Sequence, residues 1–554
     1  MLEKRHGRRV PELTAQVVAA AFPKGSLAVW LRNALGEVFS DELLAEAFPA
    51  NGRPAISPGA LAAVSLLQYA DNLSDRQAAE AVRARMDWKY LLGLELTDPG
   101  FDHSVLSDFR ARLAEHGLEE KIFEEVLEVA AARGLLRSRG RQRTDSTKIL
   151  ADVRLLNRME FVGEVLRTAL EGLAAAHPSW LEEVLAGQEE QWLRRYGERI
   201  DSWHGELPGA DREQWLRQVG EDGFFLLEKV DDAQAPAWLP LIPAVAALRR
   251  CWDEQYLRDE HGVHAREGAQ LPPGAQRAVS PHDLEARYGT KRGQGWTGYT
   301  LHVSETCDAD APRLITDVAT AAASDGDDST ALPGIHQRLE RRGLLPAEHL
   351  LDSGYITAAA LVEAADTRGV VLIGPARPIT TDTADGRFTH KDFLIDDEAR
   401  TAVCPGGHSS ASWAQTHSMR GVPIIQVRFA AADCRACPLR QRCTTAGNPK
   451  WGRALTLRHP RQRAALQQRR REQDTPAWRH RYRLRAGIES TVHQLTRRTG
   501  LRRSRYRGLQ RTHLGHCLAA AAINLIRIHT WEHGISPEPT RGTHLSRLLH
   551  RCAR

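Results

Sequence analysis

The order of strand and helix patterns along the chain restricts its fold more than any other feature of the sequence. A strand pattern leads to Asp145, a hairpin pattern covers 299–320, and short apolar strands lie at 349–352 and 369–374. A helical pattern that carries Glu489 follows these strands. Strands so far apart can meet only through the fold, in a sheet that helices then cover. The order therefore predicts an α/β protein.

Length and charge set the broad class of the chain. Its 554 residues allow several domains, and 42% hydrophobic with 26% charged content is that of an ordinary soluble protein. The net charge of +5 hides an asymmetry, since acids outnumber bases over 150–273 while the C-terminal quarter is strongly cationic. This segregation predicts one nucleic-acid-binding face. No apolar run is long enough to span a membrane, and the longest, 517–528, predicts a buried helix.

Two stretches are helical by pattern. Helix starts at Ser57, at Ser74 with Gln77 three residues on, and near Ser104 predict a helical N-terminal domain. Its short helices fit a helix-turn-helix DNA-binding module, and a bundle used only for packing or dimerisation is the alternative. Apolar residues at helical spacing over 150–243 predict an inserted helical subdomain, whose acidic surface makes it a poor platform for DNA. We expect the tryptophans of this insert in its core.

The helical pattern around Glu489 combines one acid with many bases. Tyr482, Arg485 and Glu489 fall at i, i+3 and i+7 and so share one face of a helix, beside an apolar stripe that begins at Ile488. Lys and Arg far outnumber Asp and Glu over 450–511. A lone Glu in such a segment is either a salt-bridge partner or a metal-binding acid placed where a phosphodiester backbone would lie.

Four of the eight cysteines cluster between the last strand pattern and the Glu489 helix. Cys404 opens a Cys-Pro-Gly-Gly turn, and Cys434, Cys437 and Cys443 follow it. Together they supply four soft ligands for one tetrahedral Zn²⁺, and His408 could replace one of them. A closed site of this kind stabilises a fold and performs no catalysis. Reduced cysteines that are neighbours by chance, or a redox pair, are the alternatives.

Several of these phrases together resemble the insertion-sequence transposases of the Asp-Asp-Glu class. Tyr482, Arg485 and Glu489 match the Tyr-x2-Arg-x3-Glu-x6-Lys signature of one branch, in which the Glu is the last catalytic acid. Thr496 stands at the Lys position, where Arg497 is the expected substitute. The N-terminal helices also resemble a domain common to many of these transposases, which favours binding of DNA ends.

The resemblance extends to the strands. Asp145, within Arg-Thr-Asp-Ser-Thr-Lys, matches the first catalytic acid, and Asp352, within Asp-Ser-Gly-Tyr, matches the second. Asp317 is the rival for the second position, and the acidic run 325–328 is interpreted as a solvated loop. Relatives also carry a Lys-Arg-Gly phrase like the one at Lys291. The resemblance implies a ribonuclease H-like core, a mixed sheet flanked by helices, with each Asp at a strand end and the Glu on an adjacent helix.

Such a core implies a specific chemistry. Carboxylates gathered in one place repel each other, and two Mg²⁺ or Mn²⁺ ions relieve the repulsion and promote in-line phosphoryl transfer. We expect the chain to bind double-stranded DNA at the ends of its own element, cleave there and join the 3′ ends to target DNA. A nuclease that does not join strands and a catalytically inactive DNA-binding regulator are the alternatives. The side chains expected to contact DNA are Tyr482, Arg485, Arg497, Arg498, Lys291, Arg292, Arg502, Arg503, Arg505 and Arg507.

The same resemblance implies a homodimer on paired ends, and the abundance of Arg over Lys indicates a bacterial protein of the cytoplasm and nucleoid. The predicted domain boundaries follow from the pattern changes. They are an N-terminal helical domain over 1–135, the first core strand over 136–150, a helical insert over 151–275, further core strands over 276–378, the cysteine insert over 379–475, the Glu489 and closing helices over 476–530, and a basic tail over 531–554.

Overall fold

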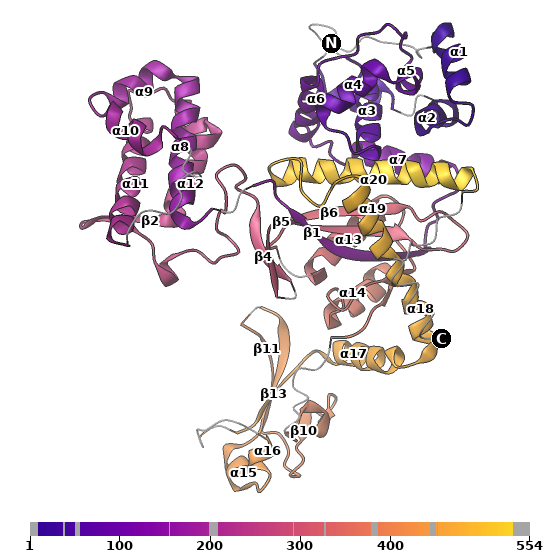
Figure 1. Cartoon of the computed structure of the whole chain (residues 1–554). Helices are drawn as coiled ribbons and strands as arrows, with labels where there is room; N and C mark the ends of the chain where they lie inside the picture. The colour runs from indigo at the N-terminus through magenta and orange to yellow at the C-terminus, as the bar shows by residue number, and fades with distance from the viewer. Residues whose placement is uncertain are drawn as a thin grey trace, which may run out of the picture.

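Helices surround one curled, six-stranded mixed sheet, and two smaller bodies extend from it (Figure 1). The computed structural model describes residues 9–36, 39–49, 56–153, 156–198, 209–291, 293–325, 328–377, 386–419, 421–443, 450 and 452–535. The α/β class predicted from the sequence is confirmed. No helix among these residues is both long and apolar enough to cross a bilayer.

The central sheet has the strand order β4-β5-β1-β7-β8, and β6 also pairs with β5. β1 is antiparallel to β5 and parallel to β7, which is parallel to β8. The predicted hairpin is confirmed as the β5–β6 pair. The strands are β1 (Arg141–Leu150), β4 (Arg287–Lys291), β5 (Gln294–Thr306), β6 (Ile315–Ala322), β7 (Glu348–Leu350) and β8 (Val371–Ile373).

A long buried helix, α20 (Leu509–Glu532), joins the sheet to the N-terminal helices. It packs on β6 from one side and on α3 (Pro58–Ala70) and α7 (Lys121–Ala132) from the other, and it is the yellow helix in Figure 1. Its buried side chains belong to one hydrophobic core that runs from the N-terminal helices into the sheet. The prediction of a buried helix over 517–528 is confirmed. α13 (Asp328–Arg341) and α14 (Ala358–Arg368) connect the later strands of the sheet.

The N-terminal helices begin where local capping signals predict. Ser57 caps α3, and Ser74 and Gln77 form a reciprocal capping box. Because α3 is buried on nearly every face, it is a packing helix. The other elements of this domain are α1 (Glu12–Ala21), α2 (Leu27–Leu35), η1 (Asp41–Ala47), α4 (Asp75–Ala84), α5 (Met86–Leu92) and α6 (Ser104–Glu115).

The helical insert has a hydrophobic core of its own. Trp192 is buried there as expected, and Trp180 and Trp215 are partly buried against this core. The expectation is wrong for Trp238, which is 44% exposed, and Trp203 lies outside the described residues. A short hairpin that the sequence patterns did not indicate closes this insert. Its elements are α8 (Arg158–Ala176), α9 (Pro178–Leu185), α10 (Glu189–Tyr196), α11 (Gly209–Val230), η3 (Leu239–Leu241), α12 (Pro243–Gln255), β2 (Tyr256–Asp259), β3 (Gly262–Ala265) and η4 (Gly268–Gln270).

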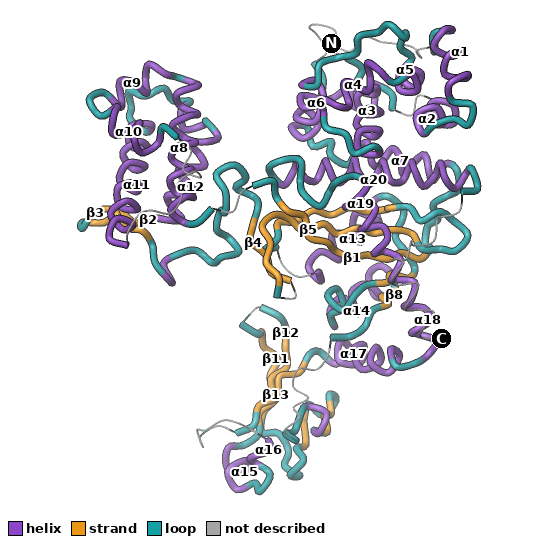
Figure 2. Tube along the Cα trace, in the orientation of Figure 1, coloured by secondary structure: helices purple, strands orange, loops and turns teal. Residues whose placement is uncertain are grey.

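The cysteine insert is a small body rich in strands (Figure 2). It has a three-stranded sheet, a two-stranded hairpin and a small core of its own, and two helices then return the chain to the central sheet. Its elements are η5 (His390–Asp392), β9 (Leu394–Asp396), β10 (Thr401–Val403), β11 (Ser412–His417), β12 (Pro423–Arg428), α15 (Ala431–Ala436), α16 (Arg440–Cys443) and β13 (Ala454–Leu457), followed by α17 (Pro460–Gln473) and α18 (Pro476–Tyr482).

Candidate active site

Two of the predicted acids follow the last pair between two neighbouring parallel strands, β1 and β7. The last parallel pair between β1 and β7 is Arg143 with Leu350, and Asp145 and Asp352 each follow two residues later. Asp145 lies inside β1 and not at its end, because β1 continues beyond β7 while still paired with β5. The register therefore brings the two carboxylates to one edge of the parallel part of the sheet.

Each of these carboxylates is oriented by a nearby backbone amide. Asp145 Oδ1 accepts from the amide of Ser146 at 2.9 Å, and Asp352 Oδ1 accepts from the amide of Gly354 at 2.7 Å. Burial raises the pKa of Asp145, and the charge of Asp352 adds to this, while Arg485 opposes it. Electrostatic coupling between the two acids is the behaviour expected of carboxylates that share a site.

Arg485 is the cation at the centre of the acids. Its Nη2 donates to Asp145 Oδ2 at 2.8 Å, and the charges of Asp145, Asp352 and Glu489 together raise its pKa against the effect of burial. Its Nε is buried and has no hydrogen-bond partner among the described residues. A guanidinium that keeps a donor unused can bind an anion such as a phosphate.

Glu489 approaches this centre from a separate helix. The prediction of one regular helix through Tyr482, Arg485 and Glu489 is wrong, because α18 ends at Tyr482 and a 3₁₀ segment, η6 (Arg483–Gly487), precedes α19 (Ile488–Arg498). Glu489 is exposed in the first turn of α19, while the apolar stripe of that helix faces the core as expected. Tyr482 stacks on Trp478, with ring centroids 4.9 Å apart.

A buried ion network holds α19 against the sheet. Glu305 on β5 is 0% exposed and pairs with Arg143 at 2.6 Å and with Arg527 at 2.9 Å. Thr491, two residues after Glu489, donates to Glu305 Oε2 at 2.5 Å. A Cβ on Gly487 would overlap the Arg143 guanidinium, so only glycine allows this close approach. Sequence reasoning missed this network, because its members are far apart along the chain.

Asp317, the rival candidate for the second catalytic acid, is paired with two arginines. Asp317 is 0% exposed within β6, and its carboxylate accepts hydrogen bonds from Arg338 and Arg342, each at 2.8 Å. A carboxylate so fully paired and buried has no oxygen facing solvent or substrate. Asp352 is therefore the better placed of the two candidates.

The sequence predicted a solvated loop for the acidic run 325–328, and this prediction is wrong for Asp328. This residue begins α13, its side chain is 11% exposed, and it binds Ser146 and Lys291. Asp325 is exposed as expected, and 326–327 lie outside the described residues. An acid at the start of a helical pattern is the signal that could have found Asp328.

The basic side chains expected to contact DNA differ in their exposure and in their partners. Arg502 and Arg503 are exposed beside the end of β1, where backbone hydrogen bonds join their segment to Leu150. Arg505 is partly buried and binds the backbone of Leu73 in the N-terminal domain. Arg497, Arg498 and Arg507 are exposed, Lys291 is paired with Asp328, and Arg292 lies outside the described residues.

The structure also accounts for Thr496, which stands at the Lys position of the family signature. Thr496 is buried, and its hydroxyl donates to the carbonyl of Val492 within α19. It therefore faces the core and cannot contact a phosphate, whereas Arg497 beside it is exposed. Sequence reasoning also missed Lys148, which lies over the Trp296 ring and donates to the carbonyl of Gln294.

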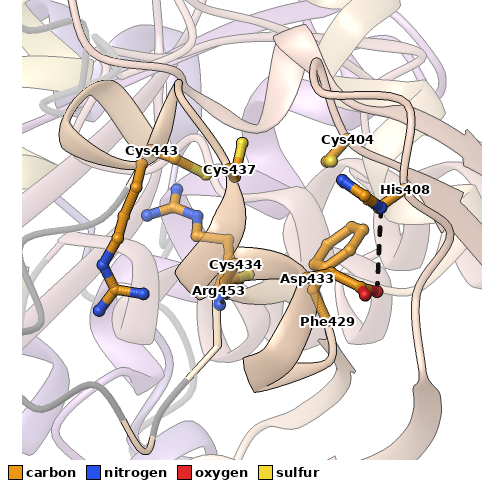
Figure 3. A pocket seen from close by; sticks show the side chains of 9 residues that line it. Cys404, His408, Phe429, Asp433, Cys434, Cys437, Cys443 and Arg453 are labelled. Carbon is orange, nitrogen blue, oxygen red and sulfur yellow. Dashed lines mark hydrogen bonds and ion pairs between the residues drawn. The ribbon is translucent and has the colours of Figure 1, made fainter.

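The four clustered cysteines line one pocket of the cysteine insert (Figure 3). All four thiols are free, and His408 and Asp433 line the same space. A Cβ on Gly406 would lie 3.2 Å from Cys437 Sγ and 3.6 Å from Cys404 Sγ. Burial raises the pKa of Cys443, and the other three thiols add to the effect. No group of three or more His, Cys, Asp or Glu side chains in the described ranges is arranged to hold a metal ion.

Comparison with known families identifies the class. A family described as Transposase DDE domain matches residues 403–529, and one described as Transposase domain (DUF772) matches residues 16–112. These two matches support an insertion-sequence transposase of the DDE class, and the first points to an enzyme of the nuclease and transferase kind. No curated protein and no solved structure matches the chain.

The first match contains Glu489 and the cysteine cluster, whereas neither match reaches Asp145 or Asp352. The assignment of these two acids therefore depends on the geometry of the sheet.

Proposed function

We propose that this transposase binds the ends of its insertion sequence, cleaves them and joins the 3′ ends to target DNA at a site formed by Asp145, Asp352 and Glu489. The observation that carries the proposal is the register of β1 and β7, since Asp145 and Asp352 each follow its last pair by two residues. The mixed sheet, with β1 between an antiparallel and a parallel neighbour, supports a ribonuclease H-like core.

The donor set suits hard divalent cations. Carboxylate oxygens are the ligands that Mg²⁺ and Mn²⁺ prefer, and a Cβ on Gly354 would lie 2.8 Å from Asp352 Oδ1, in space that the glycine leaves open. Asp145, Asp352 and Glu489 would hold the ions. Two bound ions would supply activation of the attacking oxygen and stabilisation of the leaving oxygen.

The protein's own residues would orient the DNA. Arg485, paired with Asp145, balances the charge of the acids until the substrate binds. Arg502 and Arg503 extend the positive surface along the end of β1, so they would grip the strand that leads into the site. Action on two ends at once would require a dimer.

We also propose that the cysteine insert binds one structural Zn²⁺ through Cys404, Cys434, Cys437 and Cys443. The convergence of their thiols on one pocket supports this, because thiolates are soft ligands that suit tetrahedral zinc. The small core of the insert consists of only a few side chains, and domains with cores of this size commonly depend on a bound metal for stability.

The test is cleavage of a duplex that carries the end of the element, in Mg²⁺ or Mn²⁺. Wild-type protein should nick this duplex at the element boundary, and Asp145→Ala, Asp352→Ala and Glu489→Ala should each abolish nicking. A labelled, pre-cut end should then be joined to target DNA. Nicking without joining would identify a nuclease, whereas tight end binding without nicking by the wild type would identify a DNA-binding regulator. Nicking that survives Asp352→Ala would refute the assignment of that acid.

A further inference from the structure

A fourth carboxylate lies beside the proposed catalytic acids. The side chain of Asp328 accepts a hydrogen bond from Ser146 Oγ at 2.7 Å, and Ser146 directly follows Asp145. A Cβ on Gly354 would lie 2.5 Å from Asp328 Oδ2 and 2.8 Å from Asp352 Oδ1, so the two carboxylates face each other across this glycine. The Asp-x-Gly sequence therefore has a physical reason, because any larger residue would fill the space between two acids.

The hydroxyl of Tyr355 lies among the same acids. The charges of Asp328, Asp145 and Asp352 all act with burial to raise its pKa well above the ordinary value. Its hydroxyl bonds to Nδ1 of His302 at 2.7 Å. Asp328 thus belongs to the electrostatic surroundings of the catalytic acids.

The partner of Asp328 is Lys291, at the end of the β4–β5 hairpin. Lys291 Nζ donates to Asp328 Oδ2 at 3.0 Å and to Ser146 Oγ at 2.6 Å, and its side chain is 34% exposed. An ammonium group has three donors. Its partners are both oxygens of the Asp328 carboxylate and Ser146 Oγ, and because the side chain is partly exposed a DNA phosphate can still reach it.

We propose that Asp328 is a positioning residue, which together with Ser146 holds Lys291 Nζ at the edge of the Asp145–Asp352 pair so that it contacts a phosphate of the bound DNA strand. This inference rests on the proposed function, since it assumes that DNA is the substrate. A flexible lysine loses much side-chain entropy when it binds a phosphate, and anchoring it in advance removes part of that cost.

A positioning role and simple electrostatics predict opposite effects of Asp328→Asn on DNA binding. Asp328→Asn removes a negative charge from a DNA-binding surface, and that change alone should strengthen DNA binding. If Asp328 positions Lys291, the same substitution should instead weaken binding several-fold, because the anchored ammonium is released. Asp325→Asn is a matched control, because it removes the same charge from an exposed position three residues earlier and should leave binding unchanged or slightly tighter.

The experiment measures binding of the element-end duplex by fluorescence anisotropy over a salt series without added divalent cation. Lys291→Ala should weaken binding and lower the slope of log affinity against log salt by about 1. Asp328→Asn should reproduce much of this loss and should add nothing in the Lys291→Ala background. Thermal unfolding of each variant shows whether it folds.

Three outcomes would overturn the proposal. They are binding by Asp328→Asn that equals or exceeds wild type, a loss that persists in the Lys291→Ala background, and a salt slope unchanged by Lys291→Ala. The last comparison does not depend on Asp328→Asn folding, because Lys291 lies at a hairpin end. If the wild type itself does not prefer the element end over unrelated DNA, the proposed function fails. That outcome is distinct from a failure of the Asp328–Lys291 pairing alone.

Discussion

Glu305→Gln should weaken both the stability of the core and the placement of Glu489. Glu305 is fully buried between Arg143, which is 3% exposed, and Arg527, which is 14% exposed. The glutamine keeps the volume but loses the charge, and its amide NH₂ would face a donor from Arg527 or Thr491. Two guanidinium groups would then lack their counter-ion inside the protein.

The expected size of the effect follows from the burial. Removing one partner of a buried ion pair costs about 3–5 kcal/mol, and the partial exposure of Arg527 favours the lower end, about 3 kcal/mol. For a cooperative unit of about 150–250 residues, this corresponds to a fall in Tm of about 6–12 °C. Because the single amide oxygen cannot accept from Arg143 and from Thr491 and Arg527 at once, the network loses one of its two sides and α19 should also shift. A displacement of about 1 Å at a catalytic group can cost on the order of a hundredfold in rate.

The assay combines thermal unfolding with metal-dependent nicking at a temperature where every variant is folded. Asp317→Asn is the matched control, because Asp317 is also a buried carboxylate on a neighbouring strand, paired with Arg338 and Arg342. It makes no contact with α19 through this network, since its partners are Arg338 on α13 and Arg342 just after that helix. We expect similar losses of Tm in both variants, and a large loss of nicking only in Glu305→Gln.

Equal losses of nicking in the two variants at matched stability would refute the positioning argument. So would a Glu305→Gln variant with lowered Tm and full activity, because α19 would then be held without this network.

Three further predictions concern other parts of the molecule. Arg485→Ala should weaken binding of the element end and move the acidic limb of nicking to higher pH, as measured by a pH–rate profile, because the pKa of Asp145 rises further without the guanidinium. Purified protein should release about one Zn²⁺ per chain when its thiols are blocked, as read with a metallochromic dye, and Cys437→Ser should lower that content. Burial opposes the charge of Glu120, yet the hydrogen bond from His513 and nearby arginine charges lower its pKa to about 2. The stability from this group is present above its ordinary pKa of about 4.5 and is lost as the pH falls toward 2, so Glu120→Gln should flatten the acid side of a chemical-unfolding series.

Local structure was largely predictable from the sequence where short-range chemistry controls it. The capping box of Ser74 and Gln77 and the apolar stripe from Ile488 both depend on neighbours within about one or two helical turns, and both are confirmed. The break between Tyr482 and Glu489 was not predictable in this way. A 3₁₀ segment forms there where Gly487 lies against Arg143, a residue far away along the chain that no local pattern connects to it.

The candidate site likewise has features that could be predicted from the sequence and features that could not. The residue types and phrases around Asp145, Asp352 and Glu489 could be recognised in the sequence, and the family matches support the class of protein to which they point. Whether Asp317 or Asp352 stands beside Asp145 could not be read from either phrase. The parallel register of β1 with β7 decides it, together with the arginines that occupy Asp317.

By itself, the sequence determined the α/β class, the helical N-terminal domain, the strand pairs close in the chain and the acids available for chemistry. Only the tertiary structure decided the register of β1 with β7 from which Asp145 and Asp352 follow, that Asp328 is a partly buried neighbour of Asp352 and that Lys291 pairs with it. The physical reason is range. Caps, turns and periodicity act between residues a few positions apart, whereas sheet register and buried ion pairs join residues that are distant in sequence and depend on how the whole core packs.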